Sequence, residues 1–192
     1  MIKILDITFD PEDATSYLNT LDADYQHYHW EYVKHHPDPR GLGDNNCLKS
    51  MHAYGLQTVY EDTTFPYHCD IDPHDEGPEY FKDTELVFGF FKDIKDKFKN
   101  VYRAFVMTLP PDNFIGKWTV GPRVHSKIFI PIVTNGTAWL RYFTDGQEYR
   151  VIPELGKVYQ IDMAMNENYA EIINDGDLDI TFIIFSILEC EK

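Results

Sequence analysis

Residues 124–151 have the sequence VHSKIFIPIVTNGTAWLRYFTDGQEYRV. Three short runs within this stretch, 124–133, 137–143 and 147–151, are rich in the β-branched and aromatic residues that favour strands. Asp145-Gly146 separates the second run from the third, and this dipeptide is a strong signal for a tight turn between antiparallel strands. The stretch therefore predicts a succession of short β-strands with tight connections.

The same pattern continues on both sides of this stretch. Further strands are predicted over 101–109, 157–161, 169–173 and 180–188, with a second turn signal at Asp175-Gly176. Ahead of them, four apolar residues at spacings of three and four predict an amphipathic helix over 84–98 that packs on a sheet: Val87, Phe91, Ile94 and Phe98. Helices followed by many strands predict an α+β chain with a closed or double-sheet β architecture.

The N-terminal part of the chain is less regular. We expect an opening strand over 2–9, then a helix from Pro11 to about Leu21 with Asp10 as its N-cap. Aromatic and polar residues alternate over 25–33, which predicts a strand with His27 and His29 on one face. Residues 35–80 hold many prolines and glycines, and we expect long loops there.

Length and composition predict one cytoplasmic domain over residues 1–192, with an N-terminal region 1–83 and a helix-plus-strand region 84–188. No apolar run is long enough for a membrane helix, and the first residues lack the pattern of a secretory signal. The three cysteines form no C-x-x-C pair and fit a reducing compartment, such as a bacterial or phage-infected cell.

Charge excludes two classes of partner. The chain has 32 acidic and 17 basic residues, and its net charge of −15 repels nucleic-acid phosphates and anionic membranes. The sequence shows no phosphate-binding glycine loop and no nucleophile elbow either. We therefore expect no nucleic-acid or membrane partner, and no kinase, hydrolase or hydride-transfer activity.

Five short blocks, in order and spacing, resemble the aspartyl/asparaginyl β-hydroxylase family. They are Leu109-Pro-Pro-Asp-Asn-Phe-Ile115, Arg123-Val-His125-Ser-Lys-Ile-Phe-Ile-Pro131, Thr134-Asn135, Glu154-Leu-Gly156-Lys-Val-Tyr-Gln-Ile-Asp162 and Asn174-Asp-Gly176-Asp. Family members are Fe(II)- and 2-oxoglutarate-dependent oxygenases. The resemblance covers about residues 84–188 and implies a double-stranded β-helix, a cupin-like jelly roll, with the N-terminal helices packed on one of its sheets.

The resemblance also implies an iron site, and the chain departs from the family pattern there. Lys117 stands where the first iron histidine is expected and Ala170 where the second is expected, and no histidine follows His125. Asp179-Ile180-Thr181 replaces the arginine that holds 2-oxoglutarate in the family. An ammonium has no lone pair to give to iron, and a methyl group offers no ligand atom. We therefore expect no cofactor, the alternative being Fe(II) with 2-oxoglutarate.

Four basic or titratable residues are candidates for binding an acidic ligand: Lys117, Arg123, His125 and Arg141. Arg123-x-His125 matches a family block that helps to bind carboxylates, and residues two apart on a strand share a side. An ion pair with a nearby acid, or a histidine satisfied within the core, explains the same two residues equally well.

His68 and Asp70, with His74 and Asp75 nearby, are the alternative metal ligands, because His-x-Asp resembles an iron-binding pair. A solvated loop explains them more simply.

Three functional hypotheses follow. The first is an oxygenase-like jelly roll that has lost iron and binds a small acidic molecule or a peptide. The second is an active hydroxylase of an Asp, Asn or Pro side chain whose ligands come from His68, Asp70 and His125. The third is a structural or assembly protein.

Overall fold

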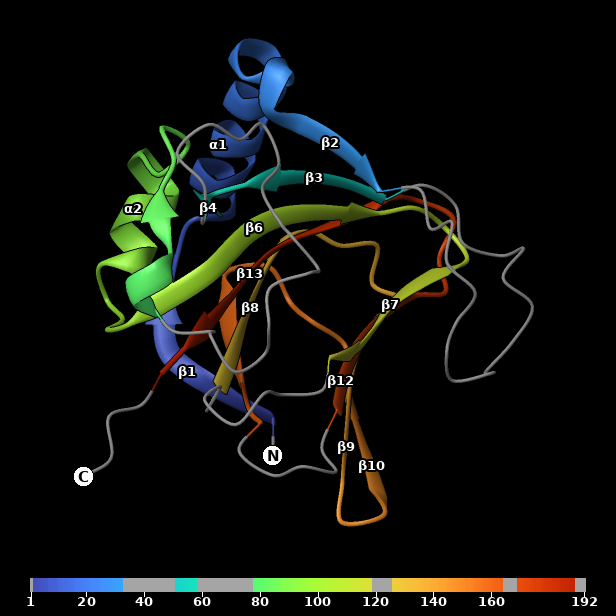
Figure 1. The fold of residues 1–192 in the computed structure, drawn as a ribbon. Coiled ribbons are helices and arrows are strands. Elements are labelled where there is room, and N and C mark those ends of the chain that lie inside the picture. The colour runs from blue at the N-terminus through green and yellow to red at the C-terminus, as the bar shows by residue number, and fades with distance from the viewer. Residues whose placement is uncertain (1, 33–50, 59–77, 119–125, 164–168, 189–192) are drawn as a thin grey trace.

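Two antiparallel β-sheets face each other and enclose a barrel (Figure 1). The structure is a computed structural model and describes residues 2–32, 51–58, 78–118, 126–163 and 169–188. The large sheet has the strand order β1-β11-β8-β13-β6-β3-β2, and the small sheet has the order β10-β9-β12-β7. The large sheet comprises β1 (Ile2–Thr8), β2 (His29–Tyr32), β3 (Met51–Gly55), β6 (Val101–Leu109), β8 (Ser126–Val133), β11 (Lys157–Asp162) and β13 (Ile180–Ile187). The small sheet comprises β7 (Asn113–Trp118), β9 (Ala138–Thr144), β10 (Gln147–Val151) and β12 (Tyr169–Asn174).

The eight strands from β6 to β13 cross repeatedly between the two sheets. Strands β6, β8, β11 and β13 are neighbours in the large sheet, whereas β7, β9, β10 and β12 form the small one. Interleaving of this kind is the double-stranded β-helix, or jelly roll, and the predicted α+β class is confirmed. Strands β1, β2 and β3 extend the large sheet at its two edges, and β4 (Gln57–Thr58) pairs with β5 (Lys82–Asp83) beside it.

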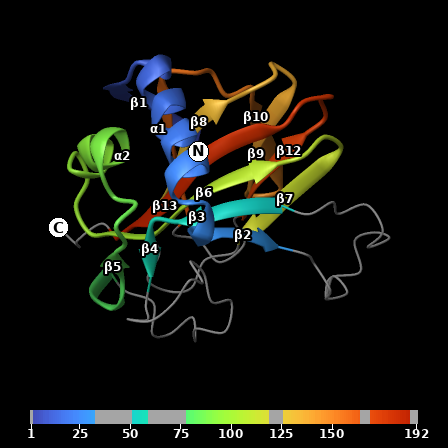
Figure 2. The same ribbon diagram turned by 90° about the horizontal axis from the view of Figure 1, so that it is seen from above.

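Two helices cover the outer face of the large sheet (Figures 1 and 2). Helix α1 (Pro11–Asp24) begins as the sequence predicts, because Asp10 Oδ1 accepts a hydrogen bond of 2.9 Å from the Glu12 N–H, and Pro11 occupies the first turn. Three residues spaced by three and four, Ala14, Tyr17 and Leu21, form its buried face. This amphipathic spacing docks the helix against the sheet.

Helix α2 (Gly89–Lys95) is shorter than the helix predicted over 84–98. The segment before it turns instead, since Thr84 Oγ1 donates to the carbonyls of Gly55 and Leu56 at 2.9 and 3.0 Å. Phe98 lies past the helix end but still packs edge-on against Phe185, with ring centroids 5.2 Å apart. The apolar spacing thus identified the buried residues Phe91 and Ile94 correctly, whereas the helix itself begins only at Gly89.

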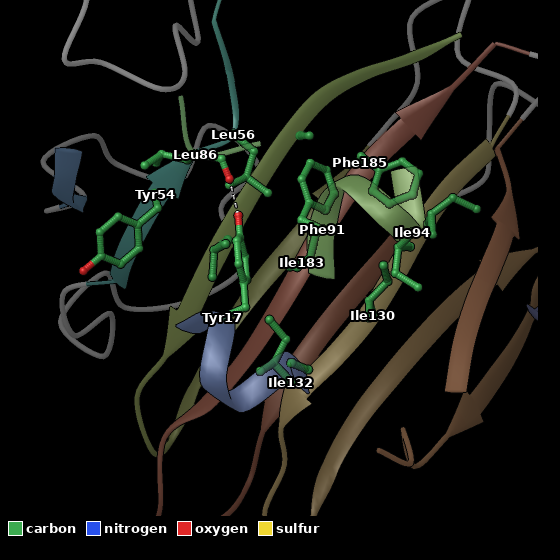
Figure 3. Close-up of a cluster of buried hydrophobic side chains, with 14 of the residues drawn as sticks. Tyr17, Tyr54, Leu56, Leu86, Phe91, Ile94, Ile130, Ile132, Ile183 and Phe185 are labelled. Carbon is green, nitrogen blue, oxygen red and sulfur yellow. Dashed lines mark hydrogen bonds between the residues drawn. The ribbon is translucent and has the colours of Figure 1, made fainter. Parts of the chain in front are cut away.

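The large sheet is buried on both faces by two separate clusters of apolar side chains. Alternate residues of β8 illustrate this, because Ile128 and Ile130 belong to the outer cluster beneath the helices, whereas Phe129 belongs to the inner cluster between the sheets. Figure 3 shows the outer cluster, where Tyr17 of α1 donates a hydrogen bond to the Leu86 carbonyl at 2.6 Å. Segments from both ends of the chain therefore share one core.

The region before residue 81 differs from its prediction in two ways. A 3₁₀ turn, Gln26–Tyr28, precedes β2, so His27 does not share a strand face with His29. Strands β3 and β4 lie within 35–80, where loops were expected, because β3 pairs with β6 and gains order from the sheet rather than from its own sequence. Among the described residues, no helix has the length and apolar content that crossing a membrane requires.

Replacing Tyr17 with phenylalanine is expected to lower the free energy of unfolding by about 1–3 kcal/mol, because the buried Leu86 carbonyl loses its donor. Urea denaturation measures the change. Thr15→Ala on the exposed side of α1 is the matched control and should change stability by less than about 0.5 kcal/mol. Equal stability of wild type and Tyr17→Phe would contradict a role for this bond.

Tyr17→Phe also tests how the stability of the protein changes at alkaline pH. Burial raises the pKa of the Tyr17 hydroxyl, with a smaller contribution from Tyr25, so the neutral phenol is favoured in the folded state. This contribution to stability is complete below the unfolded value of about 10 and is lost as the pH rises beyond it. Above that pH, the wild type should lose stability more steeply than Tyr17→Phe.

Candidate ligand-binding site at the barrel mouth

Three buried polar residues lie side by side on adjacent strands of the large sheet. Ser186 of β13 pairs directly with Lys127 of β8 on one side and with Tyr102 of β6 on the other. Strand alternation places Lys127 on the inner face, since Phe129, two residues on, belongs to the inner cluster. We call Tyr102, Lys127 and Ser186 the polar row. It lies where β8 begins and β13 ends, which is the lower end of the barrel in Figure 1.

Lys127 is the most informative member of the polar row. Its side chain is only 6% exposed, and its Nζ donates a hydrogen bond of 3.3 Å to Ser186 Oγ. Lysine is almost never buried in this way unless it is paired, because its ammonium loses hydration. In a site of low dielectric, the ammonium attracts a carboxylate more strongly than it does in water. The row can therefore supply a cation and a hydroxyl to an acidic group.

The small sheet is apolar at the same end. Ala170 of β12 pairs with Tyr142 of β9, and both side chains belong to the inner cluster. The Tyr142 hydroxyl donates to the Asp162 carbonyl of β11 at 2.8 Å, which ties the small sheet to the large one. Ala170 and Tyr142 thus present methyl and ring carbons to the barrel interior at this end.

The backbone brings together the two positions that the resemblance assigns to iron histidines. Ala170 pairs with Trp118 of β7, but its neighbour Glu171 pairs with Gly116, so Lys117 is the extra residue of a β-bulge. Bulges of this kind occur next to active sites, where they change the direction of a side chain. Positions 117 and 170 therefore lie on neighbouring strands.

The described residues do not fit an Fe(II) ion at this place. Ala170 is fully buried and presents a methyl group, and nowhere in the described part of the chain do three or more His, Cys, Asp or Glu side chains gather closely enough to hold a metal. The segment that should bring the 2-oxoglutarate arginine instead begins β13, where Thr181 and Thr108 share a hydrogen bond of 2.9 Å. The described residues at this place therefore offer no ligand set for iron.

Arg141 lies on the outer face of the small sheet. Its neighbours Leu140 and Tyr142 face the interior, and its Nε donates to Glu171 Oε2 at 2.7 Å. Glu148 lies 3.5 Å from the same guanidinium. Burial alone lowers the pKa of Arg141, but the hydrogen bond and the charge of Glu171 outweigh it and raise the pKa overall. Two carboxylates of the protein itself thus engage the cation, on the side away from the barrel interior.

The remaining predicted site residues, Arg123, His125, His68 and Asp70, lie outside the described residues. Lys127 was not predicted as a site residue. It could have been found because it is a lysine inside an otherwise apolar strand. It also follows His125 by two residues and Arg123 by four, and residues at this spacing share one face of a strand.

Comparison with known proteins supports the fold. Neither a protein-family model nor a curated protein matches the sequence. A solved prolyl-4-hydroxylase from Pseudomonas putida aligns with a TM-score of 0.56 at 10% identity, covering 98% of this chain and 92% of its own. A 2OG-Fe(II) oxygenase-family oxidoreductase from Burkholderia pseudomallei gives 0.57 at 12% identity, covering 96% and 82%.

A prolyl hydroxylase from Trichoplax adhaerens, solved with a hypoxia-inducible-factor peptide fragment, gives 0.54 at 8% identity, covering 97% and 83%. The chain has the fold of the Fe(II)/2-oxoglutarate oxygenases. The structural alignments establish the architecture, whereas at such low identity the activity depends on this chain's own residues.

Replacing Arg141 with methionine is expected to lower the free energy of unfolding by about 3 kcal/mol, because Glu171 is buried and would lose its main cation. Chemical denaturation measures the loss. Arg150→Met is the control, since Arg150 is about half exposed and its pair with Glu148 lies at the surface, so its cost should stay below about 1 kcal/mol. A smaller loss for Arg141→Met than for Arg150→Met would contradict this assignment.

Proposed function

We propose that this chain is an oxygenase-like jelly roll that binds a small acidic molecule or a peptide without oxidising it. The observation that carries the proposal is Ala170, a fully buried residue at the position of the second iron histidine, opposite a wall that carries the buried Lys127. A barrel with a cation but no metal-ligand set is suited to holding a carboxylate and not to activating oxygen.

The polar row supplies the chemistry for recognition. The Lys127 ammonium and the Ser186 hydroxyl lie 3.3 Å apart, so one carboxylate can accept from both. In the sequence, Arg123 and His125 precede Lys127 at the spacing of one strand face. This spacing of cationic or titratable groups in the sequence favours an acidic ligand with more than one carboxylate.

The closer assignment to the aspartyl/asparaginyl β-hydroxylases is part of this proposal and rests on the sequence blocks. Two of the solved structures described above are instead prolyl hydroxylases. A peptide ligand carrying an acidic side chain is compatible with both likenesses.

Calorimetric titration with dicarboxylates tests the binding function. We expect 2-oxoglutarate, succinate or aspartate to bind the wild type, and Lys127→Met to weaken that binding at least about tenfold, which corresponds to about 1.4 kcal/mol. Methionine fills a similar volume, so the barrel should stay folded. Lys92→Met, on the exposed side of α2, removes the same charge and should leave the affinity unchanged. Equal affinity of Lys127→Met and wild type would overturn the assignment of the polar row.

Turnover separates a binder from an enzyme. With Fe(II), ascorbate and 2-oxoglutarate supplied, we expect no more succinate than in a control without protein, because Ala170 offers no ligand atom. Succinate production that disappears in His125→Ala would establish the alternative, an active hydroxylase with ligands drawn from His68, Asp70 and His125. A Lys127-dependent affinity together with absent turnover supports the proposal in full.

A further inference from the structure

Two histidines meet at the edge of the large sheet, on the face that the helices cover. His52 of β3 and His29 of β2 place Nδ1 and Nε2, respectively, 3.0 Å apart. Their rings are nearly parallel, with an angle of 20° and centroids 4.9 Å apart. Both residues are half-buried, so solvent reaches them while their neighbours restrict their movement. We call His29 and His52 the histidine pair.

The strand register explains why the two rings meet. His29 pairs with Tyr54 and Glu31 pairs with His52, so His29 and His52 are diagonal neighbours on one face of the β2–β3 ribbon. Tyr54, two residues from His52, belongs to the outer cluster beneath the helices. The histidine pair therefore lies on the opposite side of the sheet from the polar row.

Tyr54 holds one side of the pair in place. Its hydroxyl donates to Asp22 Oδ1 of α1 at 2.6 Å and accepts from Gln26 Nε2 at 3.0 Å. The His29 ring packs against the Tyr54 ring with centroids 5.4 Å apart. A fixed neighbour reduces the entropy that the histidines lose when they bind a ligand.

We propose that the histidine pair binds a divalent transition-metal ion, with Zn²⁺ as the probe. Imidazole nitrogens bind zinc at about 2.0–2.1 Å, so two of them on one ion lie about 2.9–3.4 Å apart for bond angles between a right angle and the tetrahedral angle. The observed 3.0 Å falls within this range, and the rings must turn so that both lone pairs meet at the ion. Without metal, one of the two rings donates an N–H hydrogen bond to the other ring. When the metal binds, the donor ring carries its proton on its other nitrogen, and the nitrogen that has lost the proton gives its lone pair to the ion.

The surroundings favour a cation with oxygen ligands in the remaining positions. Two imidazoles leave two positions of a tetrahedral ion for water or a carboxylate. The net charge of −15 also raises the local concentration of cations at the surface. The pair is therefore a metal site independent of the proposed function, whose tests measure dicarboxylate binding and succinate.

Zinc titration of chelator-treated protein tests the site. We expect saturable binding of Zn²⁺ alone, with the ring nitrogens of His29 and His52 shifting in nitrogen-detected histidine NMR spectra of the wild type. His29→Ala and His52→Ala should each weaken this binding at least about tenfold. His27→Ala is the matched control, because His27 is exposed and lies beside Glu85 rather than in the pair, and it should bind zinc as the wild type does.

Two results would overturn the proposal. One is a wild-type spectrum in which the His29 and His52 ring nitrogens do not move when zinc is added. The other is undiminished zinc affinity in the His29→Ala/His52→Ala double variant, which would assign the ion to other histidines. The NMR measurement uses the unmodified chain, so the site remains testable even if an alanine variant folds poorly.

Discussion

The large sheet must bury both of its faces, and the rest of the structure follows from this constraint. In β8, Ile128 and Ile130 pack under the helices while Phe129 packs between the sheets. Strands with this double burial are apolar along their whole length rather than alternately polar. The outer face requires the two helices as a cover, and the inner face requires the small sheet. One layer of strands thus determines the positions of the other two layers.

The same constraint makes Lys127 conspicuous. In a strand whose other inner positions hold groups such as Phe129, an ammonium with 6% exposure is costly to bury, and the hydrogen bond to Ser186 offsets part of that cost. Across the barrel, the fully buried Ala170 contributes a methyl group to the interior, at the position where the resemblance implies an iron histidine. The architecture shared with oxygenases is therefore compatible with a different use of the interior, because function resides in side chains placed on a fold.

Local sequence predicted most strands of the barrel, the first strand and helix α1, but missed β3 and β7. Strands β6 and β10 match their predictions residue for residue, because β-branched residues and the Asp145-Gly146 turn act locally. Strand β3 was missed because pairing with β6 orders it, and β7 was missed because it follows Pro110-Pro111 with few β-branched residues.

The candidate site was predicted only in part, for a related reason. The spacing of the sequence blocks predicted that Ala170 stands where the family has its second iron histidine, and the structure places Ala170 beside β7. The burial of Lys127 depends on which strands lie on either side of it, and a single sequence does not contain that information. The interaction of His52 with His29 likewise depends on the pairing of β2 with β3, two strands separated by a long stretch of chain.

The pairing of the first strand has a consequence for how the chain acquires its structure. Ile2 pairs with Ile161, so β1 has no partner until most of the polypeptide has left the ribosome. Contacts between such distant positions slow folding, because the intervening chain must lose its freedom before the contact forms. Strand β1, and α1 joined to it, therefore complete the large sheet late in folding.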